Sequence, residues 1–438
     1  MEDKPAAINV IWLGMILIAT VTAAYKGTMD QVTKASFDAA KAAVTLAINL
    51  IGPMALWLGL MRVAEDGGLL RFMARCLKPV MVRLFPDVPP GHPAMSAMIM
   101  NMAANALGLG NAATPMGIKA MKELDRLSTR KGTATNAMCL FLAINTSSVT
   151  LLPLGVITVR AAAGATHPAA ILLPSILATT ISTLVAVMAA KFFEGRQAPF
   201  HGQEVVFESS DQIPGQEELS TSQGSPSRVS MGLTAKLFVW AAIAAFVLAS
   251  IARLVHHPPG ALFSLEVINN ISSWLIPVLI CLFLIFGFFR GIPVYESMTE
   301  GAKEGFETAV KIIPYMVAIF VAIGMLRASG AMDLFIKFLA PVTGFIGMPP
   351  EALAMALMRP LSGSGAFGIM SDIVSRAPDS FLSYLVSVMQ GSTETTFYVL
   401  AVYFGSVGIR QTRHALPAAL CADVAGILAS VWISRLFY

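Results

Sequence analysis

Two stretches decide the fold of this chain: residues 100–110, which read MNMAANALGLG, and residues 358–368, which read MRPLSGSGAFG. Each breaks an apolar region with small and polar residues. Each is followed by a polar stretch inside an apolar run, AINTSSVT at 143–150 and MQGSTETT at 389–396. A duplicated membrane unit with matching Gly-interrupted segments is the best sequence pointer to a binding site at a repeat interface. The pattern therefore predicts a transporter-like protein.

The composition indicates an integral membrane protein. Of the 438 residues, 56% are hydrophobic and 13% charged, whereas a soluble domain carries roughly 25% charged residues. The lipid bilayer is therefore the first expected partner. The net charge of +4 is small and no basic block is interleaved with aromatic residues, so nucleic acid is not expected as a partner. The spacing of the four cysteines fits neither a disulfide framework nor a zinc site, and we expect no metal and no cofactor.

Hydropathy predicts an all-α polytopic membrane protein with about nine spanning helices, because apolar runs of roughly 18–25 residues match the thickness of a bilayer. The runs lie near 7–25, 42–62, 133–158, 169–193, 235–255, 270–289, 307–327, 380–405 and 415–437. Residues 194–233 are acidic and rich in Ser, Gln and Gly, which predicts a disordered linker. The linker would separate a first repeat, 1–193, from a second, 234–438.

Charge predicts that the two repeats have opposite orientations in the membrane. Basic residues flank the first Gly-interrupted stretch on both sides, and the positive-inside rule places both flanks in the cytoplasm. They are Arg62, Arg71, Arg75, Lys78 and Arg83 before it, and Lys119, Lys122, Arg126, Arg130 and Lys131 after it. The segment 92–117 would then enter the membrane and return on the same side, as a re-entrant segment. The flanks of the second copy are poor in base, which indicates the external side and an inverted-topology repeat. We expect a multi-pass protein of the bacterial inner (cytoplasmic) membrane with a cytoplasmic N-terminus.

The Gly-interrupted stretches supply candidate substrate-binding groups. Irregular backbone at membrane depth must be satisfied by protein or by a water-filled cavity, and amides and hydroxyls there can bind a polar ligand. The candidates are Asn101, Asn105, Asn111, Ser362 and Ser364. The alternative is that these small residues only allow helices to pack closely.

The two mid-span polar stretches supply the other candidates. An isolated Ser or Thr in a helix bonds its own i−4 carbonyl, but four or more consecutive polar residues cannot all do so, which predicts an unwound helix. The candidates are Asn145, Ser147, Ser148, Gln390, Ser392, Thr393, Glu394 and Thr395.

Arg359 and Glu394 are ionisable residues within apolar segments, where a charge costs roughly 2.5–3.5 kcal/mol or more. One interpretation is a structural ion pair between them. The other is that Glu394 binds a cation, a proton or a donor group of a substrate, while Arg359 orients it or holds an anionic group. The first copy carries no charge at either position.

The motifs resemble a known family. The stretch NMAANALGLGNAATPMG at 101–117 resembles the signature of spore maturation protein A, and RPLSGSGA at 359–366 with QGSTETTFY at 390–398 resembles that of spore maturation protein B. The chain is thus similar to a fusion of the two. The resemblance implies a nucleoside recognition, or Gate, domain, which is also found in concentrative nucleoside transporters and in the ferrous iron transport protein. The chain lacks the Gly-x-x-x-x-Gly-Lys-Ser/Thr motif of a GTPase.

These observations favour a membrane transporter-like protein that binds or moves a small polar solute, such as a nucleoside, or a coupling cation. The alternative is a non-transporting membrane scaffold that supports envelope or spore maturation. An enzyme is not expected, because we find no nucleophile-and-base set at membrane depth. The sequence leaves the substrate open and is compatible with a homo-oligomer.

Overall fold

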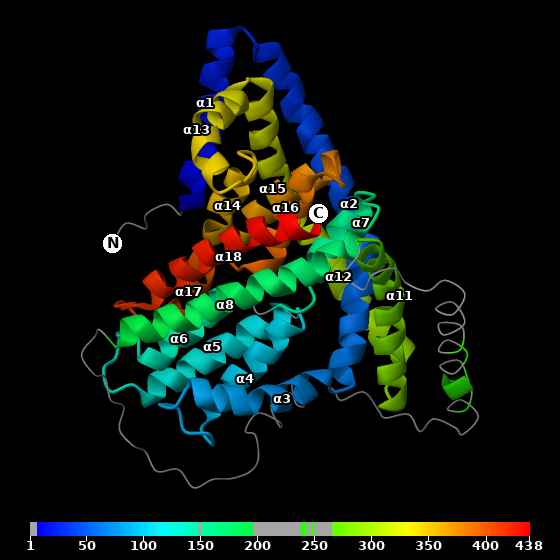
Figure 1. The fold of residues 1–438 in the computed structure, drawn as a ribbon, viewed down its shortest axis with the longest axis vertical. Helices are drawn as coiled ribbons and strands as arrows, with labels where there is room; N and C mark the ends of the chain where they lie inside the picture. The colour runs from blue at the N-terminus through cyan, green and yellow to red at the C-terminus, as the bar shows by residue number, and fades with distance from the viewer. Residues whose placement is uncertain are drawn as a thin grey trace.

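The computed structural model describes residues 7–108, 110–147, 150–195 and 265–438, together with a few positions between 237 and 248. This part of the chain is helical and contains no strand, as expected for an all-α membrane protein (Figure 1). Residues 196–233 of the expected linker and most of the expected span at 235–255 lie outside the described residues, whereas Glu194, where the linker was expected to begin, is the last residue of a helix.

The two halves contain the same order of helices. The first half has α2 (Met29–Asp66), α3 (Leu69–Leu84), the hairpin of α4 (Pro93–Ala106) and α5 (Gly110–Leu127), α6 (Asn136–Thr146), α7 (Leu154–Ala162), η1 (Pro168–Ile171) and α8 (Leu172–Glu194). The second has α12 (Val294–Ala328), α13 (Ala331–Phe345), the pair α14 (Ala352–Leu361) and α15 (Gly363–Arg376), α16 (Phe381–Ser392), α17 (Thr396–Gly405) and α18 (Ala415–Phe437). Two further helices, α1 (Ala7–Lys26) and α11 (Leu265–Phe289), precede them.

The long helices α2 and α12 run antiparallel in close contact. A Cβ added at Gly305 would lie 2.6 Å from the Cα of Ala55, and one at Gly324 would lie 2.9 Å from the Cβ of Ala39. The residue number in α2 falls as the number in α12 rises, which defines the antiparallel direction. Glycine is required at Gly305 because backbone lies where a side chain would begin.

The helices α8 and α18 also run antiparallel. In their middle, the Ser182 hydroxyl donates to the carbonyl oxygen of Ala422 at 2.9 Å. Near the end of α8 and the start of α18, Asn136 donates to Glu194 and accepts from Arg413. The helices α2 and α12 have the same place in the helix order of their halves, and so do α8 and α18. In both pairs the two helices pack against each other and run in opposite directions.

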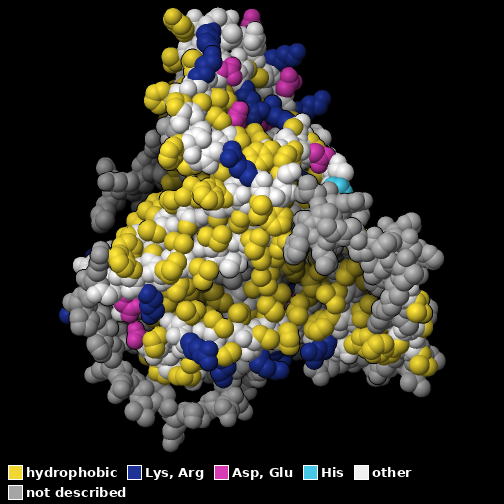
Figure 2. Space-filling view, in the orientation of Figure 1, with side chains coloured by type: hydrophobic (Ala, Val, Ile, Leu, Met, Phe, Trp, Pro, Cys, Tyr) yellow, Lys and Arg dark blue, Asp and Glu magenta, His cyan; other side chains and the backbone are white. Residues whose placement is uncertain are grey.

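The short helices α3 and α13 lie at opposite ends of the molecule (Figure 1). On α3, Arg71, Arg75, Lys78 and Arg83 are all exposed. Figure 2 shows hydrophobic side chains over the middle of this face, with Lys and Arg along its lower edge and charges of both signs at its top. Such a surface suits a protein whose middle contacts lipid and whose ends contact water.

Four helical segments in the described part of the chain are long and apolar enough to cross a membrane: α2, η1 with α8 (Pro168–Glu194), α12 and α18. The runs expected at 133–158 and 380–405 are not continuous helices, because each breaks at its polar stretch. Segment 92–117 forms the hairpin of α4 and α5. Gly108 in its turn has φ +74°, and a Cβ there would lie 2.8 Å from the Leu152 carbonyl oxygen.

Each of the two larger hydrophobic cores contains residues from both halves. One packs Phe141 of α6 with Tyr403 and Phe404 of α17. The other packs Leu50 of α2 with Met355 of α14 and Met389 of α16. The halves are therefore interlocked, and the polar breaks of both lie within this shared packing.

Candidate functional site

The breaks in the two interrupted helices meet. The helix α6 ends at Thr146 and α16 ends at Ser392, and the backbone N–H of Glu394 donates to the carbonyl oxygen of Thr146 at 3.0 Å. The ends of broken helices leave carbonyl and amide groups without intrahelical partners. Here each break supplies a partner to the other, and we call this meeting point the crossing.

In the first half, asparagine side chains tie the α4–α5 hairpin to the crossing. The Asn105 amide donates to Asn145 Oδ1 at 2.8 Å. The Asn101 amide donates to the Ala113 carbonyl at 2.8 Å and to the Tyr403 hydroxyl at 3.0 Å. That hydroxyl in turn contacts Asn145 Oδ1 at 3.3 Å. One network therefore joins α4, α5, α6 and α17.

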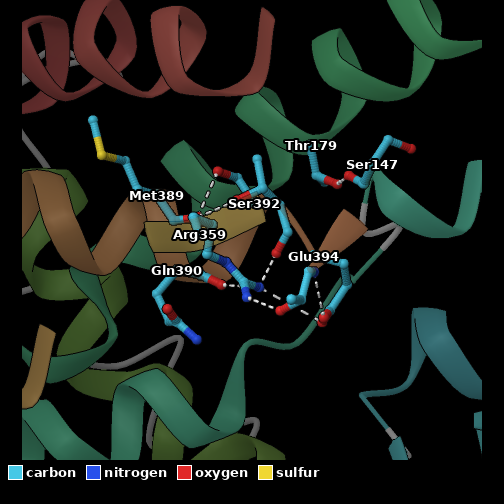
Figure 3. Close-up of polar contacts among 9 residues, drawn as sticks. Ser147, Thr179, Arg359, Met389, Gln390, Ser392 and Glu394 are labelled. Atoms are coloured by element: carbon cyan, nitrogen blue, oxygen red, sulfur yellow. Dashed lines mark hydrogen bonds and ion pairs between the residues drawn. The ribbon is translucent and has the colours of Figure 1, made fainter. Parts of the chain in front are cut away.

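In the second half, Arg359 of α14 reaches into the break after α16 (Figure 3). Its Nη1 donates to Thr395 Oγ1 at 3.2 Å, and its Nη2 donates to the carbonyl oxygens of Gln390, at 3.3 Å, and of Thr393. The side chain is only 4% exposed. Its hydrogen-bonding capacity is thus directed mainly at protein oxygens, which leaves little of it for an anionic ligand.

Glu394 forms the ion pair with Arg359 and is also open to its surroundings. Its Oε1 lies 3.7 Å from Arg359 Nη2, and its side chain is 47% exposed. Its Oε2 accepts from the backbone N–H of Thr395 at 3.3 Å. The ion pair, one of the two interpretations that the sequence left open, is present, and nearly half of the Glu394 side-chain surface is exposed.

The buried hydroxyls near the crossing bind other protein groups. The Ser392 and Ser430 hydroxyls lie 2.9 Å apart, and Thr393 donates to the Met389 carbonyl at 2.9 Å. The Ser147 hydroxyl lies 2.9 Å from the Thr183 hydroxyl. The backbone carbonyl of Ser147 accepts a hydrogen bond from the Thr179 hydroxyl at 2.9 Å (Figure 3). These groups hold the breaks in place.

The turn between α14 and α15 lies directly against the crossing. The Ser362 hydroxyl accepts from the backbone N–H of Gly365 at 3.1 Å and so caps α15. A Cβ at Gly363 would lie 2.8 Å from Thr395 Oγ1. Ser364, in the first turn of α15, is exposed. Because Gly363 has no side chain, the turn can approach the break closely.

The structure thus divides the predicted site residues into two groups. Those with open surface are Asn105, Ser362, Ser364, Gln390 and Glu394, and we call them the accessible group. Those buried among protein groups are Asn101, Asn145, Ser147, Ser392, Thr393 and Thr395. Asn111 belongs to α5, but its side chain, like the whole of Ser148, lies outside what the structure describes.

Two residues that the sequence analysis did not single out also belong to this region. Asp423 of α18 is 3% exposed and accepts a hydrogen bond from the Thr396 hydroxyl at 2.7 Å. Asp423 lies within the last apolar run, 415–437, so a charged residue inside an apolar run is the signal that could have identified it. Tyr403 bridges Asn101 and Asn145, and nothing in the sequence around it indicates that role.

A separate open cavity of about 820 Å³ lies between α2, α7, α12 and α15. Its polar lining includes Lys41, Asn49, Arg327, Asp372 and Arg376. None of the predicted site residues whose side chains the structure describes lines it. Asp372 is 2% exposed and is held by both arginines, Arg327 at 3.1 Å and Arg376 at 2.8 Å.

Comparison with known proteins supports the resemblance. The chain matches the model of the "Nucleoside recognition" (Gate) family over residues 47–163 and 309–410, which together make up half of its length. Every predicted site residue lies within these two segments. The missed Asp423 lies outside them.

Two curated relatives are each matched over nearly their whole length. Spore maturation protein B of Bacillus subtilis (strain 168) is 47% identical over 175 residues, which are 40% of this chain and 98% of the relative. Spore maturation protein A of the same strain is 44% identical over 190 residues, 43% of this chain and 97% of the relative. Inner membrane protein YjiG of Escherichia coli (strain K12) is 30% identical over 83 residues, which are 19% of this chain and 54% of the relative. This multi-pass membrane chain therefore belongs to the nucleoside recognition (Gate) family and is homologous to both spore maturation proteins.

Proposed function

We propose that this protein is a transporter-like protein of the bacterial inner membrane that binds a small polar solute at the crossing. In this proposal, residues 1–193 and 234–438 are inverted-topology repeats joined by a disordered linker at 194–233, and the protein is not an enzyme. The antiparallel packing of α2 with α12 and of α8 with α18 supports the inversion.

The observation that carries the proposal is the hydrogen bond between the Glu394 N–H and the Thr146 carbonyl. It brings together two helices that are each broken at a polar stretch. In membrane transporters, broken helices commonly form the substrate site near the middle of the bilayer, since helix ends offer unpaired backbone groups and partial charges. The accessible group lies around that point.

The chemistry of the accessible group favours a solute with several hydrogen-bond donors. Asn105 and Gln390 supply amides and Ser362 and Ser364 supply hydroxyls, which both donate and accept, whereas Glu394 supplies a carboxylate that only accepts. A nucleoside carries sugar hydroxyls and a base edge that match such groups. A bare metal ion would gain less from this lining, because only one member of the group carries a charge.

The test is ligand-dependent unfolding of the purified protein. A ligand that binds only the folded state raises the melting temperature, so we expect a rise with nucleosides and none with dicarboxylates. The substitutions Glu394→Gln and Asn105→Ala should abolish the rise while the protein remains folded. Glu300→Gln is the matched control, because Glu300 is 59% exposed and its carboxylate pairs with Lys303.

Solute flux in proteoliposomes then separates transport from a scaffold function. A transporter should accumulate the stabilising nucleoside inside vesicles, and the Glu394→Gln variant should not. Protein that binds no solute and moves none, while Glu394→Gln retains full function in cells, would overturn the proposal in favour of a membrane scaffold.

A further inference from the structure

We propose that the Arg359 guanidinium is a built-in cation, which fills the place that a broken membrane helix otherwise offers to an inorganic cation. The crossing in the second half would then need no Na⁺ or K⁺ to be structurally complete. This inference rests on the proposed function, because it assigns a cation to the same site. Its test measures the response of the protein to cations and requires no solute.

Oxygen atoms of the protein surround the guanidinium. Two are carbonyl oxygens at the end of α16, from Gln390 and Thr393, and the third is the Thr395 hydroxyl. The carboxylate of Glu394 lies 3.7 Å away. Carbonyls of an unwound helix, a hydroxyl and a carboxylate form the kind of oxygen-only shell that binds alkali cations in transporters with broken helices.

The end of α16 also favours a positive charge on electrostatic grounds. The last turn of a helix carries a partial negative charge, and α16 ends at Ser392, directly before the Glu394 carboxylate. A positive charge is needed there to offset both. Arg359 supplies it from α14, and its side chain is only 4% exposed, so it is not a surface group that a soluble cation would readily replace.

The two halves differ in the side chain that reaches the helix break. Asn105 lies near the end of α4, as Arg359 lies near the end of α14, and its amide reaches the end of α6 as Arg359 reaches the end of α16. Its partner is the neutral side chain of Asn145, at 2.8 Å. The first break is thus contacted by a neutral amide and the second by a fixed charge.

The experiment measures the melting temperature of the full chain in NaCl, KCl and choline chloride at constant ionic strength. We expect the wild-type protein to melt at the same temperature in all three salts. The Arg359→Ala variant should be less stable in choline chloride and should gain about 2–4 °C when Na⁺ or K⁺ replaces choline, saturably. Adding Glu394→Gln to that variant should remove the gain, because the carboxylate is the anionic ligand of the vacated site.

Arg160→Ala is the matched control. Arg160 is also a buried arginine, 3% exposed, but its contacts are the Ser383 hydroxyl at 3.5 Å and the ring of Tyr384 at 5.8 Å. Its loss should lower the melting temperature equally in every salt. Arg359→Lys should fold and remain independent of salt type, because the ammonium group still provides a tethered cation.

Two results would overturn the inference. One is saturable stabilisation of the wild-type protein by Na⁺ or K⁺ that Glu394→Gln abolishes. The other is an Arg359→Ala variant, or an Arg359→Gln variant if the alanine form cannot be purified, that does not respond to cations or is unfolded in every salt. If the wild-type protein binds no nucleoside but these salt responses are observed, the proposed function is wrong while the inference about Arg359 stands.

Discussion

The backbone N–H of Glu394 lies 3.0 Å from the carbonyl oxygen of Thr146, and this bond joins two helix breaks that are far apart in the chain. Each residue also lies in or directly beside a side-chain contact of its own half. Thr146 follows Asn145, which binds Asn105, and Glu394 pairs with Arg359. The crossing therefore connects the α4–α5 hairpin with the α14–α15 pair through an unbroken series of contacts.

The Tyr403 hydroxyl should stabilise the network of the first half. In Tyr403→Phe, the Asn101 amide loses an acceptor at 3.0 Å and Asn145 loses a contact at 3.3 Å, both among buried groups. An unsatisfied buried group costs about 1–3 kcal/mol, so we expect a clear drop in the midpoint of denaturant unfolding. Tyr398→Phe is the control, since Tyr398 is 55% exposed, and it should leave the midpoint unchanged. Equal midpoints for the two variants would exclude a structural role of the hydroxyl.

Gly305 should tolerate no side chain. In Gly305→Ala the new methyl group would lie 2.6 Å from the Ala55 Cα, and backbone cannot move aside as a flexible side chain can. Overpacking of this kind costs about 1–3 kcal/mol, and thermal unfolding would measure it. Gly52→Ala in α2 is the matched control, because no atom lies within 4 Å of its Cβ position. Alanine there should be neutral or stabilising, since it favours a helix over glycine. A fall in stability in both variants alike would count against close packing of α2 on α12.

The sequence was sufficient to place the two helix breaks, because a run of polar residues inside an apolar segment cannot remain an unbroken lipid-facing helix. The stretches 143–150 and 389–396 do contain the ends of α6 and α16. The Arg359–Glu394 pair could be foreseen for a similar reason, since a buried charge needs a partner.

The sequence was not sufficient to show that the breaks meet, or which atoms they share. The Thr146 carbonyl and the Gln390 and Thr393 carbonyls are backbone atoms, which every residue has, so no pattern of residue types distinguishes them. The role of Tyr403 depends on where α17 packs against α6, and that is a property of tertiary structure. Inverted orientation, solute binding and the linker remain predictions.

Acid should destabilise the protein through His414, which lies just outside α18 and is 3% exposed. Burial lowers the pKa of His414 from 6.5 to about 4, and the charge of Arg413 adds to this effect. The unfolded chain therefore binds the proton first as the pH falls. The contribution of neutral His414 to the free energy of unfolding is complete above pH 6.5. It is lost as the pH falls towards 4, by about 3 kcal/mol at most. In His414→Gln, unfolding free energy measured between pH 7 and pH 4 should fall less steeply than in the wild-type protein. Parallel pH profiles would show that another group dominates.

The opposite placement of α3 and α13 predicts that they face opposite sides of the membrane. Cys76 on α3 is exposed and can serve as the first label position when Cys139, Cys281 and Cys421 are changed to serine. Lys337→Cys on α13, in a background that also lacks Cys76, provides the second, since Lys337 is exposed as well. A membrane-impermeant maleimide should label Cys76 only from the cytoplasmic side, because basic flanks remain inside, and the α13 position only from the external side. Labelling of both positions from one side would contradict the inverted repeat. The proposed solute site would then depend only on the contact between the two breaks, which is independent of their orientation in the membrane.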